Sequence, residues 1–462
     1  MKTNGEILFR NIFHLVTMND RDDRLSGVDL LVRGHRIADI GEKLDAPGAR
    51  VLDASSCLII PGLINTHHHL YQTLQRNIPA VQNAELFDWL KTLYRVWQHL
   101  TPEAVRIGTM LGCGELLKTG CTTTLDQHYV FPRGVDEDLI GIQVKAAGRL
   151  GIRFHATRGS MSRGQSQGGL PPDSVVQDED TILEDCLRVI ERHHDPAPFS
   201  MTRVAISPCS PFSVSRELLV ETIRLARDKG VLCHTHVAET RDEESYCQEV
   251  YGMRPLELME SVGWAGQDVS FAHGIHFTDQ ELDRVAEAGT AIAHCPTSNM
   301  RLGSGVARVP RMMAKGITVG LAVDGSASND SSDMIGEMRN GLLMHRLTFG
   351  AAAMTARDML HLATRGGARL LIRPELGSLE VGQAADLAMI DMNRLEYTGA
   401  LSDPLAALVF SGIDHTVDLT LVNGQIVVQD GRLVNVDEEQ LIEQGQRISG
   451  EMLRRAGLTM HE

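Results

Sequence analysis

Short apolar runs and longer amphipathic stretches alternate through the middle of the chain. Eight such runs recur: LIIPGLINTHHH (58–69), CTTTLDQHY (121–129), IRFHATRG (152–159), TRVAISPCS (202–210), VLCHTHVAE (231–239), VSFAHG (269–274), AIAHCP (291–296) and TVGLAVDG (318–325). Short apolar runs between helical segments are typical of strands buried on both faces. Eight strands alternating with helices predict an α/β fold, a (β/α)₈ barrel, which we place over residues 61–372. The alternative, an open doubly wound sheet, has no G-x-G-x-x-G fingerprint after a strand to support it.

The two ends of the chain share a different pattern. VDLLVRGHRIADIG (28–41) alternates apolar and polar residues, and DLTLVNGQIVVQDGRLV (418–434) contains two tight-turn signals between β-rich runs. We therefore expect residues 1–60 and 373–435 to form one small β-sandwich domain. A polar helical tail is expected over 436–462. The Gly-, Ser- and Pro-rich segment 159–177 predicts a long loop over one end of the barrel, with the character of a lid.

Net charge and the pattern of cysteines limit which partners and which cellular compartment we expect for this protein. The 44 basic and 60 acidic residues give a net charge of −16, which argues against nucleic acid or an anionic membrane as a partner. The N-terminal MKTNGEILFR has no apolar signal core, and no apolar run approaches a membrane span. The eight cysteines form no C-x-x-C pair and are typical of buried thiols in a reducing compartment. We expect a cytoplasmic protein.

Candidate ligands and acids recur where the predicted strands end. These residues are His67, His69, His128, Cys209, His236, Glu239, His273, His294 and Asp324. Barrel enzymes carry their chemistry at the carboxyl ends of the strands. Because imidazole is costly to bury without partners, several histidines at one strand end predict a transition-metal site.

Side-chain alternation divides the histidine triplet. Successive strand residues point to opposite faces, so His67 and His69 are expected on one side and His68 on the other. The same reasoning pairs His234 with His236, of which one is expected to be a ligand and the other to support it.

The motifs PGLINTHHH, HVAE, AHG, HCPTSN and VDG together resemble the amidohydrolase superfamily, in its deaminase branch acting on purine, pterin and triazine rings. The resemblance covers almost the whole chain. It implies that His67, His69, His236 and Asp324 bind the metal, that His273 holds the attacking water, and that Glu239 shuttles protons. Asp324 would accept the proton of the water.

The ligand set indicates the kind of metal. Three imidazoles and one carboxylate suit Zn²⁺, with Fe²⁺ as an alternative. The fourth run, TRVAISPCS, lacks the lysine that bridges two metals in binuclear relatives, so we expect one divalent ion per chain. Such a site would hydrolyse a ring C–NH₂ group to a carbonyl and ammonia.

Substrate contacts follow from the resemblance. Gln72 matches a glutamine with which guanine deaminases read the amidine edge, and Trp89 in ELFDWL matches an aromatic segment that stacks on the purine. Cys209, in SPCSPF, stands where guanine deaminases place an arginine. Longer stretches such as NTHHHLYQTLQR (65–76), LFDWLKTLY (86–94) and VDGSASND (323–330) resemble bacterial 8-oxoguanine deaminases. This resemblance implies conversion of 8-oxoguanine and water to urate and ammonia.

Several alternatives stay open. Guanine, isoxanthopterin or an aminotriazine could be the substrate. A cyclic amide hydrolase of the hydantoinase type lacks its bridging lysine here, and a metal-binding scaffold would not need Glu239. As partners we expect a small heterocycle and no nucleic acid or membrane, in a homo-oligomeric assembly.

Overall fold

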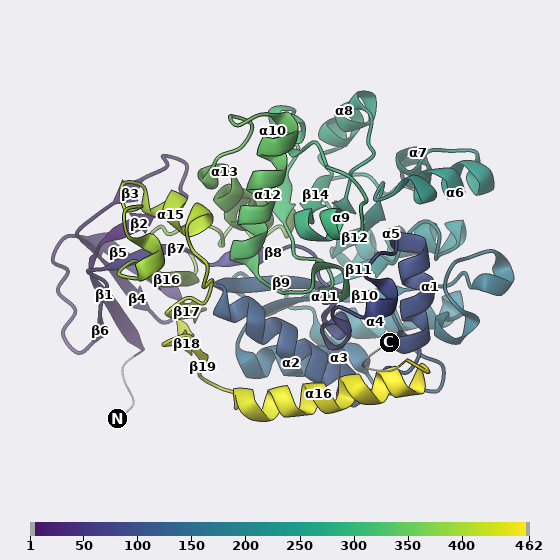
Figure 1. The fold of residues 1–462 in the computed structure, drawn as a ribbon, viewed down its shortest axis with the longest axis horizontal. Helices are drawn as coiled ribbons and strands as arrows, with labels where there is room; N and C mark the ends of the chain where they lie inside the picture. The colour runs from purple at the N-terminus through teal and green to yellow at the C-terminus, as the bar shows by residue number, and fades with distance from the viewer. Residues whose placement is uncertain (1–4, 459–462) are drawn as a thin grey trace.

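The computed structural model describes residues 5–458 and contains an eight-stranded parallel barrel (Figure 1). Its strands are β8 (Leu63–Asn65), β9 (Cys121–His128), β10 (Arg153–Ser160), β11 (Thr202–Pro208), β12 (Leu232–Val237), β13 (Val269–His273), β14 (Ala291–His294) and β15 (Val319–Leu321). They neighbour one another in sequence order, and the Thr66 amide donates to the Leu321 carbonyl at 3.1 Å where the first strand meets the last. The predicted barrel is confirmed.

Helices follow the barrel strands. They include α1 (Leu86–Trp97), α2 (Pro102–Lys118), α3 (Leu139–Leu150), α4 (Glu179–His193), α5 (Arg216–Lys229), α6 (Arg241–Tyr251), α7 (Pro255–Ser261), α8 (Asp279–Ala288), α9 (Pro296–Arg301), α10 (Val309–Ala314), α11 (Ser326–Asn329), α12 (Met334–Phe349), α13 (Ala356–His361) and α14 (Gly367–Leu370). Helix α5 shows the local rules: the Ser215 hydroxyl accepts from the Leu218 amide at its start, and Gly230 ends it in left-handed conformation. Its Leu219 and Ile223 are buried toward the barrel core.

Two further sheets contain the remaining strands. A seven-stranded mixed sheet has the order β19 (Arg432–Leu433), β18 (Gln425–Gln429), β17 (Leu419–Val422), β16 (Leu387–Asp391), β7 (Cys57–Pro61), β2 (His14–Val16) and β3 (Arg24–Leu25). A four-stranded sheet has the order β5 (Arg36–Gly41), β4 (Val28–Arg33), β1 (Glu6–Ile12) and β6 (Arg50–Asp53). The two chain ends thus build β structure together, as predicted, beside the barrel (Figure 1). The domain boundaries stay a prediction.

The first apolar run serves two sheets rather than one strand. Its first part, β7, pairs with β16 of the mixed sheet, whereas β8 pairs with β9 of the barrel. Gly62 lies between them, and a Cβ atom there would stand 2.3 Å from the Thr122 hydroxyl. Glycine is needed here because the chain passes so close to the neighbouring strand.

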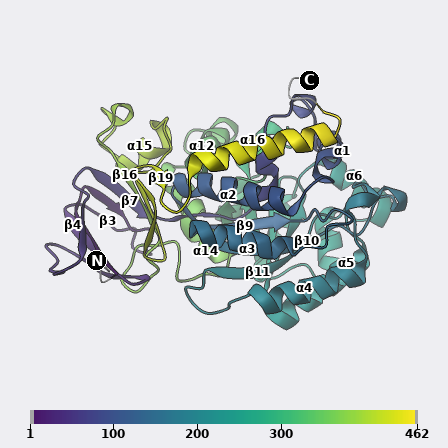
Figure 2. The same cartoon turned by 90° about the horizontal axis from the view of Figure 1, so that it is seen from below.

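The C-terminal helix α16 (Glu438–Arg455) runs along α2 on the outside of the barrel (Figure 2). The Lys118 ammonium pairs with Glu438 at 2.9 Å, and the Ser449 hydroxyl donates to the Leu74 carbonyl at 2.6 Å. Residues 1–4 of the predicted small domain and 459–462 of the predicted tail lie outside the described residues. Within 5–458, no helix combines the length and apolar character needed to cross a membrane.

The Gly- and Pro-rich segment 159–177 forms irregular chain with two 3₁₀ turns, η3 (Gln165–Gln167) and η4 (Asp173–Val175). The amides of Ser162 and Arg163 both donate to the Ser213 carbonyl at 3.1 Å, which ties the loop to the segment after β11. Its action as a lid stays a prediction. All eight cysteines of the chain are buried.

Candidate metal centre and substrate pocket

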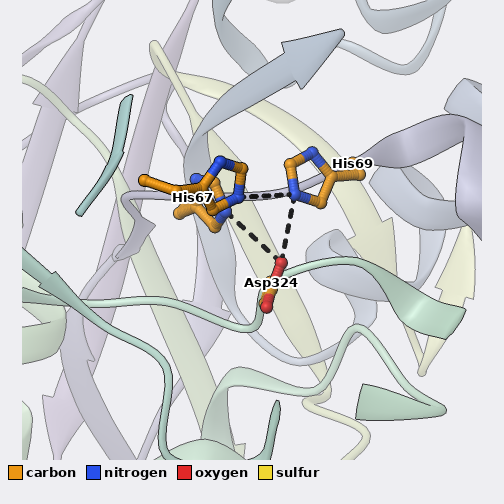
Figure 3. A group of neighbouring side chains, drawn as sticks. His67, His69 and Asp324 are labelled. Carbon is orange, nitrogen blue, oxygen red and sulfur yellow. Dashed lines mark hydrogen bonds and ion pairs between the residues drawn. The ribbon is translucent and has the colours of Figure 1, made fainter. Parts of the chain in front are cut away.

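Three imidazoles and one carboxylate converge at the carboxyl ends of the barrel strands. The ligand atoms of His67, His69, His236 and Asp324 all lie within 4.8 Å of one another, and all four side chains are buried. His67 Nε2 and His69 Nε2 stand 3.3 and 3.2 Å from Asp324 Oδ1 (Figure 3). His236 Nε2 is 3.3 Å from His69 Nε2. The structure therefore assembles the four residues that the resemblance implies as ligands.

The outer nitrogens of these rings show which tautomers are present. His69 Nδ1 donates to the Gln127 carbonyl at 2.8 Å, and His236 Nδ1 donates to the Cys209 carbonyl at 2.6 Å. A carbonyl oxygen only accepts, so in the neutral rings both Nε2 atoms carry lone pairs. Two lone pairs 3.3 Å apart beside a carboxylate repel one another unless a cation lies between them. The donor set therefore fits a divalent metal ion.

A hydrogen-bonded chain orients His67 in the same way. Its Nδ1 lies 2.7 Å from His234 Nε2, and His234 Nδ1 lies 2.8 Å from the Ser270 hydroxyl. Ser270 donates in turn to the Cys233 carbonyl at 3.4 Å, so its oxygen is free to accept from His234. His67 Nε2 is buried and has no hydrogen-bond partner among the described residues, as expected for a ligand atom. Of the pair His234 and His236, the structure thus places His236 in the cluster and His234 behind it.

His68 points away from the cluster. Its Nε2 is 3.0 Å from the Ser332 hydroxyl. Burial lowers the pKa of His68 to about 3, so the ring is neutral. The alternation expected for a strand thus continues past Asn65, where β8 ends.

Asp324 is fixed on both carboxylate oxygens. Its Oδ1 accepts from the Gly325 amide and its Oδ2 from the Ser298 hydroxyl, both at 2.6 Å. Hydrogen bonds donated to both oxygens favour the charged form of a carboxylate, so Asp324 is held ready to bind a cation. Its backbone is left-handed, with φ of 66°, an uncommon conformation for a residue other than glycine.

Glu239 and His273 face each other beside the cluster. His273 Nε2 lies 3.6 Å from Glu239 Oε2 and 3.8 Å from Asp324 Oδ2. His273 Nδ1 lies 2.8 Å from Asn299 Oδ1, which fixes the ring plane. Burial, with the nearby charge of Asp324, raises the pKa of Glu239 to about 8. A buried carboxyl group whose pKa is shifted toward neutrality suits a residue that both gives and takes a proton.

Glu243 holds the backbone that carries Glu239. One Glu243 oxygen accepts from the Ala238 amide at 2.8 Å and the other from the Glu239 amide at 2.9 Å. Ala238 has a φ of 57°, so the chain turns sharply between β12 and α6. Sequence reasoning missed this carboxylate, although its place in the first turn of α6 is typical of an acid that binds free amides.

A pocket over the cluster contains the three residues predicted to contact substrate. Gln72, Trp89 and Cys209 line it together with His69, Glu239 and Asp324. The Gln72 amide is buried, and neither its oxygen nor its nitrogen has a hydrogen-bond partner among residues 5–458. The buried indole nitrogen of Trp89 also has no partner within that range. Such polar atoms are costly unless a ligand or water satisfies them.

Sequence reasoning missed two aromatic residues of this pocket, Tyr129 and Phe212. The Tyr129 ring meets His69 edge-on with 5.1 Å between centroids. Tyr129 directly follows His128 at the end of β9, so its position beyond a strand was the available signal.

Two of the strand-end histidines do not join the cluster. His294 Nε2 pairs with His345 Nε2 of α12 at 3.1 Å. His128 packs edge-on against Tyr71 and Phe131, with centroid distances of 5.3 and 5.0 Å. Position at a strand end was therefore not enough to select the residues of the cluster.

The amidohydrolase family model matches residues 58–427. The chain belongs to the amidohydrolase family. The 8-oxoguanine deaminase of Pseudomonas aeruginosa PAO1 is 44% identical over 94% of this chain and 96% of its own. Hydroxydechloroatrazine ethylaminohydrolase of Pseudomonas sp. strain ADP is 38% identical over 94% and 93%. Atrazine chlorohydrolase from Arthrobacter aurescens TC1, solved with zinc, is 35% identical with a TM-score of 0.92 over 96% of this chain and 100% of that one. This amidohydrolase is thus an enzyme with a buried metal site.

Proposed function

We propose that this amidohydrolase is an aminohydrolase that replaces the amino group of a nitrogen heterocycle with a carbonyl, consuming water and releasing ammonia. The observation that carries the proposal is the buried His67, His69, His236 and Asp324 cluster with Glu239 facing it in one pocket. These four side chains would hold one divalent ion, Zn²⁺ first and Fe²⁺ second. The ion, when bound, lowers the pKa of a water molecule toward neutrality.

In this mechanism, different residues around the cluster carry out the separate proton transfers. Asp324, as a carboxylate, accepts the first proton from the attacking water. His273, held by Asn299, orients that water. Glu239 gives its proton to a ring nitrogen and then helps the amine leave as ammonia. As the carbonyl forms, Glu239 takes back a proton from the hydroxyl group on the ring carbon, and Asp324 passes its proton to the departing amino group. Both side chains thus return to their starting states, and the ring carbon gains an oxygen where it loses nitrogen.

The pocket supplies the contacts that read the heterocycle. The Gln72 amide offers one donor and one acceptor to an edge with N–H beside N, as in an amidine. In this proposal Trp89 packs on the ring and Cys209 contacts it, which their shared place in the pocket lining supports. These contacts favour a flat heterocycle with adjacent donor and acceptor atoms.

The preferred substrate in this proposal is 8-oxoguanine, which would give urate and ammonia. The 44% identity to an 8-oxoguanine deaminase supports it. An aminotriazine is the second candidate, supported by the 38% identity to hydroxydechloroatrazine ethylaminohydrolase. Guanine and isoxanthopterin complete the set to be compared. 8-Oxoguanine carries N7–H and O8 where guanine has a bare N7 and a C–H, and each buried group left unmatched costs about 1–3 kcal/mol.

Ammonia-release kinetics on the metal-loaded enzyme test the proposal. We expect kcat/KM for 8-oxoguanine to exceed that for guanine by about tenfold or more, the equivalent of one unmatched polar group. Elemental analysis should find one divalent ion per chain. A tenfold preference for guanine, isoxanthopterin or an aminotriazine would reject 8-oxoguanine and keep the mechanism. Ring-amide hydrolysis without ammonia would reject deamination itself.

A Glu239→Gln variant tests the proton shuttle. An amide neither gives nor takes a proton at neutral pH, so kcat should fall by about 10²–10⁴-fold while metal content stays unchanged. Retention of more than about a tenth of the wild-type kcat would remove Glu239 from this role.

A further inference from the structure

We infer that Gly325 is a positioning residue for substrate recognition, because its missing side chain creates the space that the Gln72 amide occupies. The inference rests on the proposed function, in which Gln72 reads the heterocycle. A Cβ atom on Gly325 would lie 1.9 Å from Gln72 Oε1, 2.5 Å from Cδ and 3.1 Å from Nε2. All three nearest atoms thus belong to the one amide group, although 253 residues separate the two positions along the chain.

The backbone does not require glycine at this position. Gly325 has φ of −70° and ψ of 140°, an extended conformation that any residue adopts. Its amide donates to Asp324 Oδ1, a contact that alanine would retain. The space for Gln72 is therefore the feature that a larger residue would remove.

The Gln72 side chain, on the other side of this contact, faces the pocket in which a ligand would bind. The Gln72 side chain is only 1% exposed, belongs to the 3₁₀ helix η1 (Leu70–Gln75) and lines the pocket. Its oxygen and nitrogen lack hydrogen-bond partners in the part of the chain that the structure describes. Because Gly325 directly follows Asp324, one short turn positions both the Asp324 carboxylate and the space that the Gln72 side-chain amide occupies. The turn thereby fixes how far the recognised ring edge lies from the reacting carbon.

Gly325→Ala should move the amide without unfolding the enzyme. The atoms in conflict are the end of a flexible side chain, which can rotate away from the new methyl group. The rotation displaces the amide from the position in which it would contact the heterocycle. The expected consequence is poorer binding of the heterocycle with an intact metal cluster.

A double-mutant cycle tests the inference with Gly325→Ala, Gln72→Ala and the two combined. Each single variant should lower kcat/KM for 8-oxoguanine by about tenfold or more, mainly through KM. In the double variant the shortened side chain leaves room for the methyl group. Its kcat/KM should therefore stay within about twofold of Gln72→Ala. Metal content and Tm should match wild type in all three.

Gly148→Ala is the matched control. Gly148 is an exposed residue of α3, and a Cβ atom there would meet no other described residue within 4 Å beyond its own helix, so this variant should keep wild-type kinetics. Multiplying losses in the double variant, wild-type kinetics in Gly325→Ala, or loss of metal from that variant would each overturn the inference while leaving the proposed function intact. Unchanged kinetics in Gln72→Ala would instead show that the proposed substrate contact is wrong, and the inference with it.

Discussion

At the scale of single residues, the orientation and tautomers of the histidines in the metal centre depend on groups that do not bind the metal. Carbonyl oxygens of Gln127 and Cys209 select the tautomers of His69 and His236, and both sit on strands or turns that the barrel fixes. No sequence motif announces these carbonyls, because every residue has one. The histidines could be predicted from their spacing in the sequence. The carbonyl groups that orient their rings could be identified only from the folded structure.

The histidine triplet provides a prediction at this scale. His69→Ala should lose most of the bound metal, because it removes a ligand atom. His68→Ala should retain about one ion per chain, since His68 contacts Ser332 instead of the cluster. Elemental analysis of both purified variants after dialysis measures this difference. Equal metal loss in the two variants would show that His68 is as important to the site as His69.

At the scale of elements, the segment between β12 and α6 is held by a single buried carboxylate. Two consecutive amides, of Ala238 and Glu239, bind one carboxylate from the first turn of the following helix. The HVAE motif indicated Glu239 from the sequence, but not Glu243. A glutamate in a polar helix start resembles any solvated residue, and only its complete burial distinguishes it.

Glu243→Gln tests this constraint. The amide replaces one acceptor oxygen by a donor, so one of the two backbone amides loses its partner, at about 1–3 kcal/mol. If the loop is needed to aim Glu239, kcat should fall about 5- to 150-fold while metal content and KM stay near wild type. Glu249→Gln, on the exposed side of α6, is the control. A pure loss of Tm with normal kcat would indicate that Glu243 only stabilises the fold.

Most of the barrel could be predicted because each strand has its own apolar run. The first run was the exception, since one stretch contains both β7 and β8. Periodicity reports burial, and both strands are buried, so it could not show the change of sheet at Gly62. Likewise, the approach of Gly325 to Gln72 joins residues on opposite sides of the barrel seam, which no local pattern encodes.

At the scale of the whole molecule, contacts between distant segments hold the added β structure to the barrel. His415, in the segment before β17, pairs with Asp333, the N-cap of α12. The hydrogen bond to Asp333 raises the pKa of His415 above its ordinary 6.5, with burial and Arg339 acting in the opposite direction. The proton is therefore bound more tightly in the folded protein than in the unfolded chain.

This linkage predicts a pH-dependent stability. Because the pKa of His415 is raised in the folded protein, its contribution to the free energy of unfolding is fully present below about pH 6.5. That contribution is lost as the pH rises through the folded-state pKa. The loss of Tm caused by His415→Gln should therefore be larger at pH 6 than at pH 9. Thermal unfolding of both proteins at the two pH values measures it. A larger loss at pH 9 would contradict the linkage.

The change of sheet at Gly62 also has a consequence for the order in which the enzyme is made. Strand β7 leads directly toward His67 and His69, yet its partner β16 lies more than 300 residues later in the chain. On the ribosome, every metal ligand and every barrel strand emerges before that partner is synthesised. One edge of β7, the strand just before the first ligands, therefore stays unpaired until residues 387–391 have been synthesised. Nascent chains that stall in between expose this edge, and an exposed strand edge favours aggregation.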